Sequence, residues 1–335
     1  MVVRKNFVDV IRRAKTFLIL THVRPDGDAI SSSIAMYEFL VSLGKNSKNI
    51  EVFIPHISKD LSFIDKNNIL TKNCKMEKHD LAIIVDCSDY SRVEGSHLLE
   101  RVSPQQCILI DHHEASGNPI KTEYPVIDTS APSCTCIIYR ELSMYMSEQN
   151  SKYFNRYIAI GIMSDTIGLT LNVTEECKDI LSYCKKSGVY IQAISEQLKN
   201  IDVRTQTLAN VAIERLVFDQ GIGCTYILQA DLTPEEYSLK TVNHKAIIQQ
   251  ILDSASCKTL ILLIENDNHE IKGSMRTTVS NIDLNAICAS MVERKCFLHG
   301  GGHSNSAGFK MAIPDTTMAT LNRIFKLLIA AILGS

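Results

Sequence analysis

The chain contains no apolar run long enough to cross a membrane. Its longest such stretch, Leu327–Leu333, is far shorter than the roughly 20 residues that a membrane-spanning helix requires. Basic residues at Arg4, Lys5, Arg12 and Arg13 interrupt the amino-terminal segment, which therefore lacks the apolar centre of a signal peptide. We expect a cytoplasmic protein without a membrane partner.

An excess of basic charge is also missing. The 335 residues include 35 Lys and Arg against 37 Asp and Glu, which gives a net charge of −2. Proteins that hold long nucleic acids need a broad basic surface, because each neutralised phosphate adds to the affinity. We therefore expect no long nucleic acid as a partner, and a nucleotide ligand should be short.

The eleven cysteines show no disulfide pattern. Their number is odd, their spacing is irregular, and Cys134 and Cys136 are the only close pair. In a cytoplasmic chain this usage predicts free thiols that are mostly buried.

Internal repeats, low-complexity segments and a proline- or glycine-rich linker are absent as well. A chain of 335 residues is long for a single core, so two domains are expected. Apolar runs alternate with amphipathic stretches, which predicts an α/β fold with a mostly parallel sheet flanked by helices. We place this domain at residues 1–190, a helical linker at 191–210, and a smaller α/β domain with a mixed sheet at 211–335.

One polar loop organises the first domain. The apolar run Phe17–Leu20 precedes the sequence Thr21-His22-Val23-Arg24-Pro25-Asp26-Gly27-Asp28, and an amphipathic stretch from Ala29 to Leu43 follows it. Strand, loop and helix in this order open an α/β unit, and Asp28 stands where a helix cap is expected. Binding sites of such folds form where loops leave the carboxyl ends of strands.

Further acidic and imidazole side chains follow other expected elements. Asp86 and the sequence Asp111-His112-His113 stand at the ends of apolar strands, and Asp165 follows a helix. Any one of them could cap a helix or be a satisfied core residue. Parallel strands end at one sheet edge, however, and carboxylates gathered there would repel one another without cations. Together they predict two divalent metal ions, with Mn²⁺ suited best to carboxylates and imidazoles and Mg²⁺ as the alternative.

The adjacent histidines carry additional information. Neighbouring side chains of an extended strand point in opposite directions, so His112 and His113 should not bind the same metal. One of them should be a ligand, and the other should face the substrate.

Elsewhere the pattern predicts both helices and strands. Tyr90–Val102 is expected to form a helix on the sheet surface, and Ser133 to cap another helix. In the second domain, residues 224–228, 260–264 and 270–276 read as strands. The glycine-rich sequence 299–303 reads as a loop.

Five motifs occur in the order in which the DHH phosphoesterase superfamily has them. The chain resembles most closely the nanoRNase/pAp-phosphatase branch, which pairs a DHH domain with a DHHA1 domain. The matching segments are His22–Ser32, Val85-Asp86, Asp111-His112-His113, Gly161–Thr166, and Gly300–Phe309 with the preceding Ser274-Met275-Arg276.

The resemblance implies a ligand set for two metals. His22 and Asp26 would bind the first metal, and Asp86 would bridge both. The second metal would be held by three further residues, namely Asp28, His112 and Asp165.

The resemblance also implies catalytic and substrate-binding residues. Asp111 would orient the histidines, and His113 would act near the scissile phosphate as an acid or as a stabiliser of charge. The second domain would hold the substrate's terminal phosphate or its base. The residues implied there are Arg276, Gly300, Gly301, Gly302 and His303.

Two departures from the family pattern are visible. Ser31 stands where glycine is usual. The segment Ile167–Asn172 lacks the arginine that often follows the Asp165-Thr166 pair, which puts the choice of substrate in doubt.

The implied enzyme is a metal-dependent phosphoesterase that degrades short oligoribonucleotides or removes the 3′-phosphate of pAp. A phosphodiesterase of c-di-AMP or pApA is the alternative. A family II-like pyrophosphatase and a non-catalytic DHH binding subunit are weaker alternatives, since the second domain resembles DHHA1 and all the metal-binding acids are present. The oligomeric state is left open, with a homodimer as the candidate.

Overall fold

The computed structural model describes residues 7–113, 118–237, 242–255, 257–266 and 270–334. The chain divides into two compact units, Met1–Asn200 and Ile201–Ser335. The segment 191–210, expected to be a helical linker, contains helix α6 (Ile191–Lys199) and the first part of α7 (Val203–Glu214). The extents of the two expected domains stay predictions.

The first unit contains a six-stranded sheet in the order β3-β2-β1-β4-β5-β6. All of its neighbouring strands pair in parallel. The predicted α/β fold with a parallel sheet and flanking helices is therefore confirmed. The strands are β1 (Phe17–Leu20), β2 (Ile50–Phe53), β3 (Leu70–Thr71), β4 (Leu81–Val85), β5 (Cys107–Asp111) and β6 (Tyr124–Ile127).

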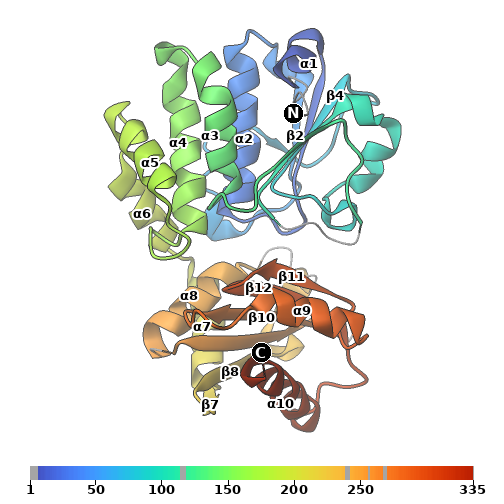
Figure 1. Ribbon diagram of the computed structural model, residues 1–335, viewed down its shortest axis with the longest axis vertical. Helices are drawn as coiled ribbons and strands as arrows, with labels where there is room; N and C mark the ends of the chain where they lie inside the picture. Colours follow the sequence, from blue (N-terminus) through green and yellow to red (C-terminus); the bar gives the residue numbers. More distant parts are fainter. Residues whose placement is uncertain (1–6, 114–117, 238–241, 256, 267–269, 335) are drawn as a thin grey trace. The chain divides into compact units, whose positions relative to one another are not determined.

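The central strands are apolar without interruption because both faces of the sheet are covered. Every residue of β1, β4 and β5 is buried. The helices of the unit are α1 (Phe7–Arg13), α2 (Gly27–Ser42), α3 (Cys134–Leu142), α4 (Glu148–Asp165), α5 (Glu175–Lys186) and α6. All of them contribute to the core on one face of the sheet, where α2, α3 and α4 pack together (Figure 1), and short 3₁₀ helices cover the other face.

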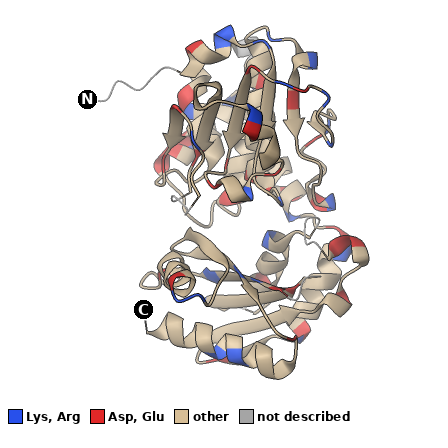
Figure 2. Cartoon of the chain, turned by 90° about the vertical axis from the view of Figure 1, so that its right-hand side faces the viewer, with Lys and Arg blue, Asp and Glu red and all other residues tan. Residues whose placement is uncertain are grey.

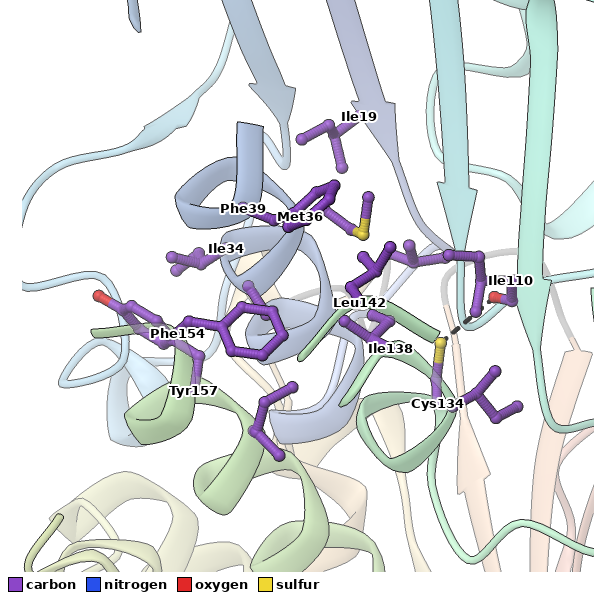
Figure 3. Close-up of a cluster of buried hydrophobic side chains, with 14 of the residues drawn as sticks. Ile19, Ile34, Met36, Phe39, Ile110, Cys134, Ile138, Leu142, Phe154 and Tyr157 are labelled. Atoms are coloured by element: carbon purple, nitrogen blue, oxygen red, sulfur yellow. Dashed lines mark hydrogen bonds between the residues drawn. The ribbon is translucent and has the colours of Figure 1, made fainter. Parts of the chain in front are cut away.

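Figure 3 shows how the helices meet the sheet. Phe39 of α2, near Ile19 of β1, and Phe154 of α4, near Tyr157, are fully buried. The thiol of Cys134, in the first turn of α3, donates a hydrogen bond to the carbonyl oxygen of Ile110 at 3.2 Å. Burying a phenylalanine or isoleucine side chain contributes about 1.5–3 kcal/mol to the stability of the fold. This packing fixes the ends of β1 and β5 relative to the starts of α2 and α3.

The expected helix over Tyr90–Val102 is wrong. This segment forms two short 3₁₀ helices, η3 (Tyr90–Arg92) and η4 (Ser96–Arg101). Between them Gly95 adopts a left-handed conformation with φ of +77°, and Val93 forms an isolated antiparallel bridge with His22. This bridge and the left-handed residue interrupt the helical repeat that the sequence suggested.

The second unit contains a mixed six-stranded sheet in the order β11-β12-β10-β9-β8-β7. Only β8 and β9 pair in parallel; the other neighbours are antiparallel. Helices α7 and α8 pack on one face, and α9 and α10 on the other. The strands are β7 (Val217–Asp219), β8 (Ile222–Ile227), β9 (Thr259–Glu265), β10 (Glu270–Thr277), β11 (His299–His303) and β12 (Ser306–Ala312). The helices beside α7 are α8 (His244–Ala255), α9 (Leu284–Glu293) and α10 (Met318–Leu333).

The expectation of a loop at 299–303 is also wrong, because these residues form the edge strand β11. Each residue is in register with one of β12, from His299 opposite Lys310 to His303 opposite Ser306. A side chain at Gly300 would contact Phe297, Phe309 and Cys288. The glycine therefore allows the strand to pack closely against α9 and two aromatic rings.

The structure can be compared with three expectations from the composition, namely those on charge, on membrane-crossing helices and on cysteines. Lys and Arg are interspersed with Asp and Glu along both units (Figure 2). Of the helices in the described ranges, none combines the length and apolar character of a membrane-crossing segment. All eleven cysteines are free and most are buried, which confirms the prediction of free thiols.

Candidate metal centre

The loop after β1 brings the first ligands to the carboxyl end of the sheet. His22 is 6% exposed, and its Nδ1 lies 2.9 Å from the carbonyl oxygen of Val23. Its Nε2 lies 3.4 Å from Oδ2 of Asp86 and 4.0 Å from Oδ2 of Asp26. A hydrogen bond from Nδ1 to the backbone leaves Nε2 as the nitrogen that can bind a metal.

Asp26, and not Asp28, is the cap of helix α2. Its Oδ1 accepts hydrogen bonds from the backbone N–H groups of Asp28 at 2.9 Å and Ala29 at 3.1 Å. The predicted cap at Asp28 is wrong because the chain already turns into the helix at Gly27. A Cβ at Gly27 would lie 2.4 Å from Oγ of Ser164, so the close approach of α4 excludes a side chain there.

Asp28 is instead fully buried against the amino terminus of α3. Its Oδ2 accepts the N–H of Cys134 at 2.7 Å, and its Oδ1 accepts the N–H and hydroxyl of Thr135 at 3.2 and 2.8 Å. Gly161 of α4 makes room for it, because a Cβ there would lie 2.4 Å from Oδ1 of Asp28. Burial, followed by the charges of Asp165 and Asp86, raises the pKa of Asp28 well above its usual value.

Asp86 lies between the other ligands. It follows β4 with φ of +57°, in the left-handed region, and its N–H donates to the carbonyl oxygen of Ile110 at 2.9 Å. One carboxylate oxygen faces His22, and the other lies 3.3 Å from Nε2 of His112 and 3.6 Å from Nδ1 of His113. Burial alone would raise the pKa of Asp86, but the imidazoles of His112 and His22 hold it well below its usual value.

The end of β5 presents both histidines to Asp86. The Nδ1 of His112 lies 3.1 Å from the carbonyl oxygen of Ala131, and its Nε2 lies 3.2 Å from Oδ2 of Asp165. The two imidazole rings contact each other edge to face, with 4.4 Å between their centroids. The prediction that they point in opposite directions is therefore wrong, since β5 ends at Asp111 and the backbone turns immediately after it.

Asp111 fixes this turn. Its Oδ1 accepts the N–H of His112 at 2.8 Å and that of His113 at 3.2 Å, and lies 2.8 Å from Nδ1 of His113. Hydrogen bonding to His113 and the charges of both imidazoles lower the pKa of Asp111, against an opposing effect of burial. The carboxylate therefore sets the direction of the His113 ring and leaves its Nε2 as the outward nitrogen.

The predicted ligands form two compact sets within the first unit. One consists of His22, Asp26 and Asp86, and the other of Asp28, His112 and Asp165. Within each set, ligand atoms from the three residues lie within 4.8 Å of one another. Both sets adjoin Asp86, which contacts His22 and His112 through different oxygens.

A divalent cation fits this arrangement on two grounds. The donors are carboxylate oxygens and imidazole nitrogens, which suit Mn²⁺, Mg²⁺ and Zn²⁺. Oδ2 of Asp111 is also buried without a hydrogen bond to any described residue. Buried anionic oxygens without a partner are costly unless a cation compensates them.

Ser31, which stands where the family usually has glycine, lies inside helix α2 and is not its cap. It is fully buried in α2, while the cap of that helix is Asp26. Its hydroxyl makes no hydrogen bond to the described part of the chain.

The residues predicted to bind substrate lie in the second unit. Arg276 of β10 and His303 of β11 are both in register with Ser306 of β12, so all three lie in one row on the same sheet face. Gly302 has φ of +151°, and its N–H donates to Oδ1 of Asn285 at 3.0 Å. A Cβ at Gly302 would lie 2.3 Å from the carbonyl oxygen of Ser306, so glycine is required there.

Several functional contacts were not predicted. Thr135, Gly161 and the carbonyl of Ala131 position Asp28 and His112, and Asn285 holds Gly302. The sequence predicted only that Ser133 caps α3, and the structure confirms this cap. It did not predict that Asp28 binds the amino terminus of this helix.

Comparisons with known proteins identify a family domain and related chains. Residues 16–164 match the DHH family, N-terminal domain. A bifunctional oligoribonuclease and PAP phosphatase NrnA from Mycoplasma genitalium is 24% identical over 311 residues, which are 90% of each chain. The protein of the same name from Thermus thermophilus is 27% identical over 293 residues, covering 87% of this chain and 82% of that protein.

A solved structure shows the same fold. An exopolyphosphatase-related protein from Bacteroides fragilis superimposes with a TM-score of 0.77 at 22% identity, over 98% of this chain and 96% of that chain. The expected resemblance to the DHH superfamily is confirmed by the matched domain, which contains all the predicted ligands except Asp165. Residues 16–164 are thus a domain of the DHH family, and the chain is a hydrolase acting on phosphoester bonds.

Proposed function

We propose that the chain hydrolyses short oligoribonucleotides and the 3′-phosphate of pAp with the help of two divalent metal ions, of which Mn²⁺ is the first candidate. The observation that carries this proposal is the position of Asp86, whose two oxygens face two separate sets of ligands. The names of the Mycoplasma and Thermus relatives support the choice of substrates.

In this proposal the residues hold the metals as two sites that share Asp86. His22 and Asp26 belong to the first site, and Asp28, His112 and Asp165 to the second. Divalent cations bound there would lower the pKa of a water molecule and stabilise charge on the phosphoryl group. The protein's own contribution is positioning, because hydrogen bonds to the backbone already fix His22, His112 and Asp28.

His113 is the proposed proton donor to the leaving oxygen. Its Nδ1 is held by Asp111, it is only partly buried, and it adjoins Asp86. An imidazole fixed through one nitrogen can offer the other to a substrate atom. No serine or cysteine nucleophile is required in this scheme.

The second unit is proposed to be a DHHA1 domain that binds the remainder of the substrate. Arg276 and His303 lie in one row across β10, β12 and β11, and Gly300, Gly301 and Gly302 allow close approach of the backbone. A guanidinium and backbone N–H groups suit a phosphate or the polar edge of a base. A cytoplasmic location and a homodimer stay predictions.

A substrate panel tests the proposal directly. The purified protein would be incubated with pAp, RNA of two to five nucleotides, pApA, c-di-AMP and pyrophosphate, with Mn²⁺, with Mg²⁺ or with a chelator. We expect hydrolysis of pAp and short RNA that requires added metal. Cleavage of pyrophosphate alone, or equal rates in the chelator, would contradict the proposal, and a preference for c-di-AMP or pApA would favour the alternative phosphodiesterase.

A further inference from the structure

An arginine outside the predicted motifs lies beside the metal-binding loop. Arg92 is the last residue of η3, and its carbonyl oxygen accepts the N–H of Val23 at 2.7 Å. The next residue, Val93, bridges His22, and the N–H of Glu94 donates to the carbonyl oxygen of Thr21 at 2.9 Å. Consecutive backbone contacts therefore hold Arg92 next to a predicted metal ligand.

The side chain of Arg92 is available to a ligand. It is exposed, and within the described ranges its guanidinium makes no hydrogen bond, ion pair or ring contact. Arg24, on the neighbouring loop, is different, because its Nε is buried and it interacts within the protein. An exposed guanidinium held beside a cluster of aspartates, and yet paired with none of them, suits an anionic ligand.

The backbone contacts place Arg92 on one side of the centre. They join the segment Arg92–Glu94 to the loop that carries His22 and Asp26, which belong to the first ligand set. Arg92 therefore lies at the His22 side of the centre.

The segment that follows the predicted ligand Asp165 carries no positive charge. The segment Ile167–Asn172, where the family pattern often has an arginine, contains no Lys or Arg. The net charge of the chain is −2, so long-range attraction does not replace a local contact. A cation at the edge of the centre would supply the missing charge.

We propose that Arg92 binds the phosphate group of the substrate that is not hydrolysed, such as the 5′-phosphate of pAp. This inference rests on the proposed function and deepens it. It assigns the second phosphate to the first unit and leaves the base to Arg276 and His303. Arg92 is thus a specificity-determining residue that separates nucleotides with a 5′-phosphate from those without one.

The test compares two substrates that differ only in that group, pAp and adenosine 3′-phosphate. Arg92→Ala should lower kcat/KM for pAp by about 10- to 100-fold, mainly through KM, because a charge-assisted bidentate contact is lost. The same variant should leave hydrolysis of adenosine 3′-phosphate unchanged, and Arg92→Lys should restore part of the loss on pAp. Arg13→Ala, at an exposed arginine of α1, is the matched control and should change neither substrate.

Equal losses of Arg92→Ala on both substrates, or no loss on pAp, would overturn the inference. Calorimetric binding of both nucleotides gives a second readout that does not depend on turnover. If the wild type hydrolyses neither substrate, the pAp phosphatase part of the proposed function fails. Arg92 is then judged by binding alone, and an unchanged Kd for pAp in Arg92→Ala would refute its role.

Discussion

The two units of the chain gather functional side chains in different ways. In the first unit, β1, β4 and β5 are parallel neighbours, so residues as far apart as His22 and His112 follow strands that end at the same sheet edge. In the second unit, antiparallel register places Arg276 and His303 in one row across adjacent strands. A parallel sheet brings together the ends of its strands, whereas an antiparallel sheet aligns their interiors. The first arrangement suits a compact metal centre, and the second an extended binding surface.

The largest expected effect comes from removing the carboxylate that both ligand sets share. Asp86→Asn keeps the shape of the side chain and tolerates the left-handed backbone, but it removes the charge. We expect kcat on pAp and on short RNA to fall by about 10³-fold or more. Asp9→Asn, at an exposed position of α1, is the control and should retain full activity. Substantial activity of Asp86→Asn would show that the two sets do not act as one centre.

Metal binding should stabilise the first unit selectively. At a free Mn²⁺ concentration of 100 times Kd, linkage adds about 2.7 kcal/mol, or roughly 5 °C in Tm. Thermal unfolding followed with and without a chelator measures this shift, and Asp86→Asn should lose most of it. A shift of equal size in the variant would place the metal elsewhere.

The same stabilisation should grow as the pH rises. The folded-state pKa values of Asp28, His22 and His112 are all raised, so each group holds its proton to a higher pH than usual. A proton must leave each group before it can bind a metal, and metal affinity should therefore increase with pH. Titrations of Mn²⁺ between about pH 5 and 8 would test the sign. Affinity that falls with rising pH would contradict the assignment of these ligands.

In the second unit, two neighbouring glycines provide a matched pair. Gly302→Ala must push a Cβ against the carbonyl oxygen of Ser306, whereas a Cβ at Gly301 would meet only Oδ1 of Asn285 at 3.6 Å. We expect Gly302→Ala to lower the free energy of unfolding by about 1–3 kcal/mol. Gly301→Ala should leave stability unchanged, as measured by chemical denaturation. Loss of activity in Gly301→Ala at constant stability would then report a contact with substrate.

The smallest expected effect concerns the side chain that holds this strand. Asn285→Ala removes the acceptor for the N–H of Gly302 and should cost about 1 kcal/mol of stability, with a rise in KM larger than the fall in kcat. Asn285→Asp keeps an acceptor oxygen and serves as the control. Identical behaviour of the two variants would show that the hydrogen bond does not position β11.

The sequence predicted where the strands end. It predicted less well how the backbone and side chains are arranged at those ends. Asp86 and Asp111 follow continuous apolar runs, and such runs indicate parallel strands covered on both faces. The choice between Asp26 and Asp28 as the cap could not be made from residue types, because aspartate suits both positions. That choice depends on the approach of α4 to Gly27, which is a tertiary contact.

Two of the other errors have a similar origin. Glycine is typical of loops, but Gly300–Gly302 form a strand because β12 pairs with them and the phenylalanine rings fill the space beside Gly300. The rings of His112 and His113 lie together because Asp111 binds both of their N–H groups and turns the chain. Neither the strand pairing nor the hydrogen bonds of Asp111 can be predicted from the propensities of single residues.

The hydrogen bonds of Asp28 determine when the site can form during synthesis of the chain. Their donors, Cys134 and Thr135, stand more than 100 positions further along the chain. A ribosome must therefore release about one third of the protein after Asp28 before this carboxylate has any partner. Until then the nascent chain carries an incomplete half of its reaction centre, which is closed only when the segment through Asp165 has emerged.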